Sequence, residues 1–149
     1  MPANRTFSVV RAFVNFLLDT NHWSYLQRRH EGVMRQIRAL PADSKLYMPV
    51  IAQAELLAGV ETVVSGRRKD ELRALYEETI ERAAEVLPID SRVAVEFAQI
   101  YSQLRQAGRP IGTNDIWIAA TARVHDATLA TSDPDFGSVP KLRLVDWTK

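Results

Sequence analysis

The sequence predicts an α/β sandwich built around a mostly parallel sheet. Short apolar runs alternate along the chain with segments of helical periodicity, and this alternation is typical of parallel strands covered by helices. The chain has 149 residues, of which 46% are hydrophobic and 25% charged, enough for one globular domain with a sizeable core. It has no cysteine, which excludes disulfides, thiolate zinc sites and thiol nucleophiles.

Short apolar runs predict four to five strands. The first, VNFLL, ends in Asp19-Thr20-Asn21, which we expect to form a turn, and the second ends at Pro49. A further turn is expected over 132–136, before the last and shortest strand. The predicted strands cover 14–18, 45–50, 86–89, 127–131 and 142–147.

Helical periodicity and breaking residues predict the helices. Ser65-Gly66 separate the third from the fourth, and Gly108 with Pro110 ends the fifth. The predicted helices cover 22–29, 32–40, 51–64, 67–85, 92–107 and 112–125.

Residues 1–13 are predicted to be an appendage, either flexible or upstream of a true start at Val14, and 14–149 to be a single domain. Arg11 and Asn15 interrupt the first apolar run, which disfavours a signal peptide. No stretch approaches the ~20 apolar residues of a membrane span. We therefore expect a cytoplasmic protein that makes no membrane contact.

Two acidic residues lie at the ends of predicted strands. Asp19 follows the first strand and Asp133 the fourth, so both are expected at the carboxyl edge, where ligands bind in such sheets. Each has a purely structural alternative as a helix N-cap, and Pro134 strengthens that alternative for Asp133. Asp135 is a nearby substitute for Asp133.

Two further acidic residues lie on predicted helices among small apolar side chains. Glu55 has Ile51, Ala52, Ala58 and Gly59 as its helical neighbours, so a buried carboxylate is expected, with a position at the rim as the alternative. Asp115 falls in a first helical turn, where the helix dipole alone would favour an acid. Thr113 or Asn114 would supply the cap of that helix, which leaves Asp115 free.

Several carboxylates gathered at one edge would repel one another unless a cation neutralised them. Mg²⁺ prefers oxygen ligands and substrate phosphate, and it can activate a water. The three histidines lie far apart in sequence, which disfavours a histidine-rich zinc site. The pattern therefore indicates metal-assisted hydrolysis of a phosphodiester.

Four motifs in order carry a family resemblance over about residues 14–147. LLDTN, AELLAG, NDIWIAA and TSDPDF, with the closing LRLVDW, resemble the PIN domain and, within it, the VapC-type toxins of toxin–antitoxin pairs. The resemblance implies a three-layer α/β/α sandwich. It also implies a catalytic set of four acids, Asp19, Glu55, Asp115 and Asp133. Of these, Asp19 and Asp115 would be the direct metal ligands. Implied polar supports are Thr20 or Asn21, Asn114 and Thr131.

The last motif departs from the family, which often has Thr-Asn-Asp where this chain has Thr131-Ser132-Asp133. That departure leaves Asp133 and Asp135 as alternatives for the fourth acid. The family implies a Mg²⁺- or Mn²⁺-dependent endoribonuclease acting on RNA, a VapB-type antitoxin as partner, and a homodimer. The alternative is a non-catalytic PIN-like module that binds RNA or protein, which would require a broken acidic set.

Two residues outside the acidic set are candidates for binding. Arg109 precedes the helix of Asp115 and is a candidate phosphate contact. Trp23 is a candidate antitoxin contact, with packing in the core or in a dimer interface as the alternative. Met34 and Leu56 or Leu57 are the expected companions of Trp23 in an apolar slot.

Overall fold

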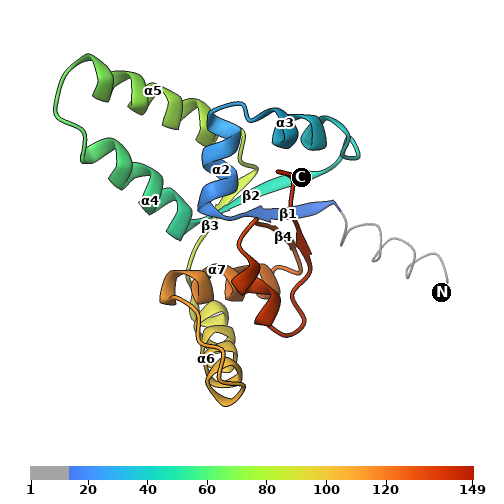
Figure 1. Ribbon diagram of the computed structural model, residues 1–149. Helices are drawn as coiled ribbons and strands as arrows, with labels where there is room; N and C mark the ends of the chain where they lie inside the picture. The colour runs from blue at the N-terminus through green and yellow to red at the C-terminus, as the bar shows by residue number, and fades with distance from the viewer. Residues whose placement is uncertain (1–13) are drawn as a thin grey trace.

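The computed structural model describes residues 14–149, in which five strands form one central sheet (Figure 1). The strand order is β3-β2-β1-β4-β5, and every neighbouring pair is parallel. The expectation of a mostly parallel sheet is confirmed, and all five strands are parallel. The strands are β1 Asn15–Leu18, β2 Lys45–Pro49, β3 Glu85–Leu87, β4 Thr128–Ala130 and β5 Leu144–Val145.

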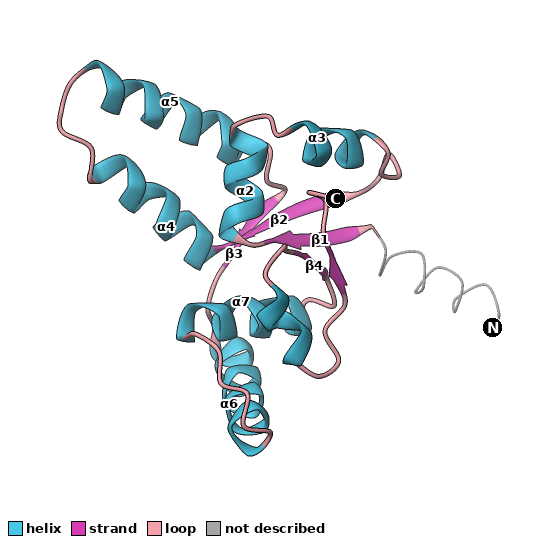
Figure 2. Cartoon of the chain, viewed as in Figure 1, coloured by secondary structure: helices cyan, strands magenta, loops and turns pink. Residues whose placement is uncertain are grey.

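Helices cover both faces of the sheet (Figure 2), which confirms the three-layer arrangement. One side carries α2, α3, α4 and α5, with α4 and α5 forming a hairpin that projects beyond the sheet, and the other side carries α6 and α7. The helices are α2 Thr20–Gln27, α3 Glu31–Arg38, α4 Val50–Glu61, α5 Arg67–Glu81, α6 Ser91–Gln106 and α7 Thr113–Val124, with a short 3₁₀ helix, η1, at Pro134–Ser138.

The central strand β1 divides the core into two clusters. Phe16 and Leu18 belong to the cluster beneath α2–α4, whereas Leu17 belongs to the cluster beneath α6 and α7. This division follows from the alternation of side chains along a strand. Because Leu17 and Leu18 are fully buried, the end of β1 is held firmly between two helical layers.

Several helices and turns differ in the structure from those predicted from the sequence. The expected turn at Asp19-Thr20-Asn21 is wrong, because α2 begins at Thr20 with Asp19 as its N-cap. The expected turn over 132–136 is largely the 3₁₀ helix η1. The helix expected to reach residue 85 ends at Glu81, since the N–H of Ala84 donates to the carbonyl of Leu46 and begins the pairing of β3.

Within residues 14–149, no helix combines the length and the apolar run that a membrane crossing requires. The predicted appendage over residues 1–13 lies outside the described part of the chain.

Candidate functional site

A small pocket lies at the carboxyl edge of the sheet, where β1 and β4 end side by side. Its volume is about 100 Å³, and most of its lining is polar. The lining residues come from the start of α2, from α4, from α7 and from the segment after β4. They are Asp19, Thr20, Asn21, Glu55, Asp115, Ile118, Asp133 and Phe136. The structure therefore brings the four sequence-predicted acids to one pocket, which we call the acidic pocket.

Asp19 is fixed by both strands that end at the pocket. Its backbone N–H donates to the carbonyl of Ala130 at 3.1 Å, which ties the end of β1 to β4. Its Oδ1 accepts a 2.8 Å hydrogen bond from the backbone N–H of His22, as an N-cap of α2. Asp19 is thus both a helix cap and part of the acidic pocket, so the two interpretations of its position are compatible.

Glu55 lies at the rim, and the expectation that its carboxylate is buried is wrong. Glu55 is exposed, and so are Ala58 and Gly59 on the same side of α4. Small residues there leave the carboxylate open to solvent rather than enclosing it. The Thr20 hydroxyl donates a 2.9 Å hydrogen bond to Oε1 of Glu55, which gives the expected supporting role of Thr20 a physical basis.

Asp115 is half-buried in the first turn of α7. Gly112 is the N-cap of that helix, so the expectation that Thr113 or Asn114 supplies the cap is wrong, and Asn114 is exposed. Burial raises the pKa of the Asp115 carboxyl from 3.8 to about 6, helped by the negative charges of four neighbouring carboxylates: Asp133, Asp19, Glu55 and Asp135. The acidic pocket therefore concentrates negative charge around Asp115.

Asp133 starts η1 and faces the acidic pocket. Its Oδ1 accepts a 2.9 Å hydrogen bond from the N–H of Asp135, and Pro134 begins the 3₁₀ helix as expected for this cap. Its own N–H donates to the hydroxyl of the buried Thr131 at 3.0 Å. Asp135 is exposed and is not among the residues that line the pocket, so the geometry favours Asp133 over Asp135 as the fourth acid.

The two binding residues predicted outside the acidic set, Trp23 and Arg109, lie in different environments. Trp23 is fully buried and its indole N–H donates to the carbonyl of Tyr47 at 3.2 Å, so the expectation that it contacts an antitoxin is wrong. Met34 and Leu56 pack beside it against the same core cluster. Arg109 is exposed in the segment between α6 and α7, where a phosphate can reach it.

His22 is a polar neighbour of the site; it adjoins the LLDTN motif, but nothing in the sequence gives it a role there. It is fully buried, and its Nδ1 lies 3.4 Å from Oδ1 of Asp19. Its position three residues after Asp19, facing the same way from α2, is the only sequence signal that could have marked it.

The donors of the acidic pocket fit a hard divalent cation, because the polar side chains that line it offer carboxylate, hydroxyl and amide oxygens. In the described part of the chain, no three His, Asp or Glu side chains already lie close enough to hold one ion together. That spacing is compatible with Mg²⁺, which usually keeps several waters and takes only one or two carboxylates directly. Asp19 and Asp115 could serve as those two.

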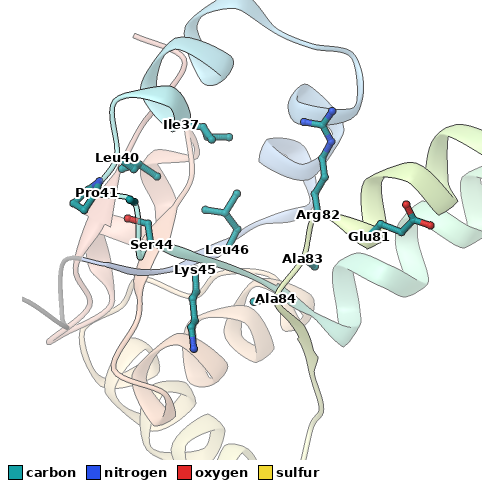
Figure 3. A pocket seen from close by; sticks show the side chains of 11 residues that line it. Ile37, Leu40, Pro41, Ser44, Lys45, Leu46, Glu81, Arg82, Ala83 and Ala84 are labelled. Atoms are coloured by element: carbon teal, nitrogen blue, oxygen red, sulfur yellow. The ribbon is translucent and has the colours of Figure 1, made fainter.

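A larger pocket, of about 430 Å³, lies at the opposite, amino edge of the sheet (Figure 3). The apolar side chains of Ile37, Leu40 and Leu46 line it together with Lys45 and Arg82, and Glu81 is its one carboxylate. Its size exceeds that of the acidic pocket, but it lacks a group of converging ligands. The chemistry therefore points to the smaller pocket.

Comparisons with known proteins find relatives that match most of this chain. The PIN domain family model matches residues 16–142. The chain is 31% identical over 136 residues to Ribonuclease VapC1 of Haemophilus influenzae strain R2866, covering 90% of this chain and 98% of that protein. It is 37% identical over 121 residues to Toxin FitB of Neisseria gonorrhoeae, covering 78% and 86% respectively.

The fold is also similar to a solved toxin–antitoxin structure. The crystal structure of VapBC2 from Rickettsia felis, bound to a DNA fragment from their promoter, superposes with a TM-score of 0.80 at 25% identity. The superposition covers 89% of this chain and 98% of the matched chain, so nearly all of the described fold is shared.

Proposed function

This chain belongs to the PIN domain family and, within it, to the VapC-type toxins, and from that membership we propose that it is a metal-dependent endoribonuclease. Its reaction is the hydrolysis of RNA phosphodiester bonds, and a cognate VapB-type antitoxin neutralises it. The observation that carries the proposal is the gathering of four carboxylates in one small pocket, where burial and the charges of neighbouring carboxylates raise the pKa of Asp115 to about 6. Carboxylates gathered in this way repel one another, and a bound cation would offset that repulsion.

Asp19 and Asp115 are the residues that would hold the ion, with Glu55 and Asp133 completing the charge around it. Mg²⁺, or Mn²⁺ in its place, would supply an activated water and offset the charge that develops on the phosphate. Thr20 holds Glu55 through its hydroxyl, and Thr131 holds the backbone of Asp133. Asn21 and Asn114, the former in the pocket lining and the latter exposed beside it, complete the polar surroundings.

Outside the acidic pocket, Arg109 is the residue that would bind the RNA. The exposed guanidinium of Arg109 binds a substrate phosphate, which requires no burial of charge. The chain functions in the cytoplasm, where its RNA substrate lies, and it acts as a homodimer.

A non-catalytic binding module would require a broken acidic set, whereas all four acids are present here.

The experiment is an RNA cleavage assay with the purified full chain. Labelled RNA is incubated with Mg²⁺, with Mn²⁺ and with excess EDTA, and the 5′ and 3′ ends of the fragments are identified. We expect internal cleavage with either ion, none with EDTA, and recovery when Mg²⁺ is restored. Cleavage that persists unchanged in EDTA would reject metal dependence, and a complete lack of cleavage with both ions would reject the ribonuclease.

A further inference from the structure

His22 occupies a buried position between the acidic pocket and the C-terminal segment. It is fully buried in α2, and its Nδ1 lies 3.4 Å from Oδ1 of Asp19. On the other side of the ring, Nε2 accepts a 3.2 Å hydrogen bond from the backbone N–H of Trp147 and lies 3.8 Å from Oδ1 of Asp146. One imidazole therefore lies between Asp19, three residues before it, and Trp147, which is 125 residues after it in sequence.

These contacts determine which ring nitrogen carries the proton. Nε2 accepts from the N–H of Trp147, so it must present a lone pair, and the proton of the ring belongs on Nδ1. In the described part of the chain, Nδ1 has no partner within hydrogen-bonding geometry. A buried donor rarely stays without a partner, and the carboxylate of Asp19 is the acceptor that it faces.

We propose that His22 is a positioning residue for the reaction, acting through Asp19; this inference rests on the proposed function. The backbone N–H of His22 donates to Oδ1 of Asp19, and Nδ1 of its ring lies 3.4 Å from the same oxygen. A small rotation of either side chain would make Nδ1–H a second donor to Oδ1, which would fix the rotation of the carboxylate and leave Oδ2 for the cation. Partners that orient a ligand in this way usually strengthen metal binding.

The same ring connects the site to the end of the chain. Trp147 is buried and packs against Phe16 at 5.2 Å and against the ring of His22 at 6.0 Å between centroids. Its carbonyl passes so close to Gly32 that a Cβ there would lie 3.1 Å away. The C-terminal segment thus packs against α2 and α3. It donates to Nε2 of His22, while Nδ1 on the other side of the ring faces Asp19.

Two substitutions test the roles of the two ring nitrogens separately. The amide nitrogen of asparagine takes roughly the place of Nδ1, so His22→Asn keeps a donor toward Asp19 and loses the acceptor for Trp147. The amide oxygen of glutamine takes roughly the place of Nε2, so His22→Gln keeps that acceptor and loses the donor toward Asp19. The two variants are therefore matched controls for each other.

The measurement is Mn²⁺ affinity by electron paramagnetic resonance, alongside the melting temperature of each metal-free variant. We expect His22→Gln to bind Mn²⁺ about tenfold more weakly or worse, with a melting temperature close to that of the wild type. We expect His22→Asn to keep the wild-type affinity and to melt at a lower temperature.

Equal losses of affinity in both variants, in proportion to their losses of melting temperature, would make His22 a packing residue only and overturn the inference. A wild-type chain that binds no Mn²⁺ would overturn the proposed function and the inference together. The tautomer is also measurable in the unmutated protein by long-range ¹H–¹⁵N NMR of the imidazole. A proton on Nδ1 supports the inference, and a proton on Nε2 contradicts it even if both variants fail to fold.

Discussion

The hydroxyl of Thr20 donates a 2.9 Å hydrogen bond to Oε1 of Glu55 and so joins the first turn of α2 to the middle of α4. Glu55 is exposed, and few constraints act on an exposed glutamate side chain. The bond therefore orients a carboxylate that would otherwise move freely at the rim of the acidic pocket. Thr20 itself is placed by Asp19, which directly precedes it as the cap of α2.

Thr20→Val removes this bond and is expected to lower RNA cleavage about tenfold, the scale typical of a lost outer-shell partner. The free energy of unfolding should fall by only about 0.5–1.5 kcal/mol, since a single neutral hydrogen-bond donor is lost. Thr62→Val is the control, because Thr62 also uses its hydroxyl at the end of α4, toward the carbonyl of Gly59. Equal activity of the two variants would show that Glu55 needs no support from Thr20.

The raised pKa of Asp115 predicts how the stability of the metal-free protein depends on pH. Its carboxyl holds its proton up to about pH 6 when folded, but only to about 3.8 when unfolded. Because the folded state binds more protons in this window, the contribution of Asp115 to the free energy of unfolding falls as pH rises from about 4 to about 6, and it stays low above that.

Asp115→Asn removes this penalty, so its metal-free melting temperature should exceed that of the wild type above about pH 6 and match it near pH 4. Thermal melts in EDTA across this range test the prediction. Asp43→Asn is the control, because Asp43 is exposed in the loop before β2, away from the pocket. A constant difference between wild type and Asp115→Asn at every pH would contradict the electrostatic origin of the effect.

Asp133 and Asp135 can be distinguished by conservative substitution. Asp133→Asn keeps an oxygen that can accept from the N–H of Asp135, so η1 should remain intact while the pocket loses a charge. We expect Asp133→Asn to weaken Mn²⁺ binding by several-fold more than Asp135→Asn, because Asp135 is exposed and outside the pocket lining. Titration calorimetry measures both affinities, and the reverse order would assign the fourth acid to Asp135.

Substitution of Trp23 is predicted to lower the stability of the protein without changing its affinity for the antitoxin. Trp23→Ala should reduce the free energy of unfolding by about 3–5 kcal/mol, as expected for a large core residue. Trp23→Phe should cost less, although the hydrogen bond to the Tyr47 carbonyl is lost. Affinity for the antitoxin, measured well below the melting temperature of Trp23→Phe, should equal that of the wild type; a large loss there would show that Trp23 becomes accessible on binding.

The sequence predicted the acids at strand ends better than the acid on a helix face. Asp19 and Asp133 follow strands that must end at the same edge, so their meeting requires only the parallel order of β1 and β4. Glu55 depends on how α4 lies across the sheet, and its small neighbours could equally have faced the core or solvent. Local periodicity contains no information on that choice.

Residues whose environment depends on distant contacts were the hardest to predict. Trp23 is buried in the core beneath α2, where its indole N–H reaches the Tyr47 carbonyl of β2, and no local pattern reports that tertiary contact. His22 meets Trp147 across 125 residues of sequence. The closing motif predicted a last strand over 142–147, yet the strand covers only Leu144–Val145, and the residues after it turn toward α2 instead.

We propose that RNA cleavage depends on an ion bound in the acidic pocket. The most direct test compares the rates of Mg²⁺-dependent cleavage of one labelled RNA by the wild type, Asp19→Asn, Asp115→Asn and the control Asp43→Asn, each shown by thermal melting to be folded. We expect Asp43→Asn to cleave at the wild-type rate, whereas the rates of the two pocket variants fall by at least about 100-fold, consistent with the loss of a metal-ion contribution of several kcal/mol. Wild-type rates in both pocket variants would contradict this proposal.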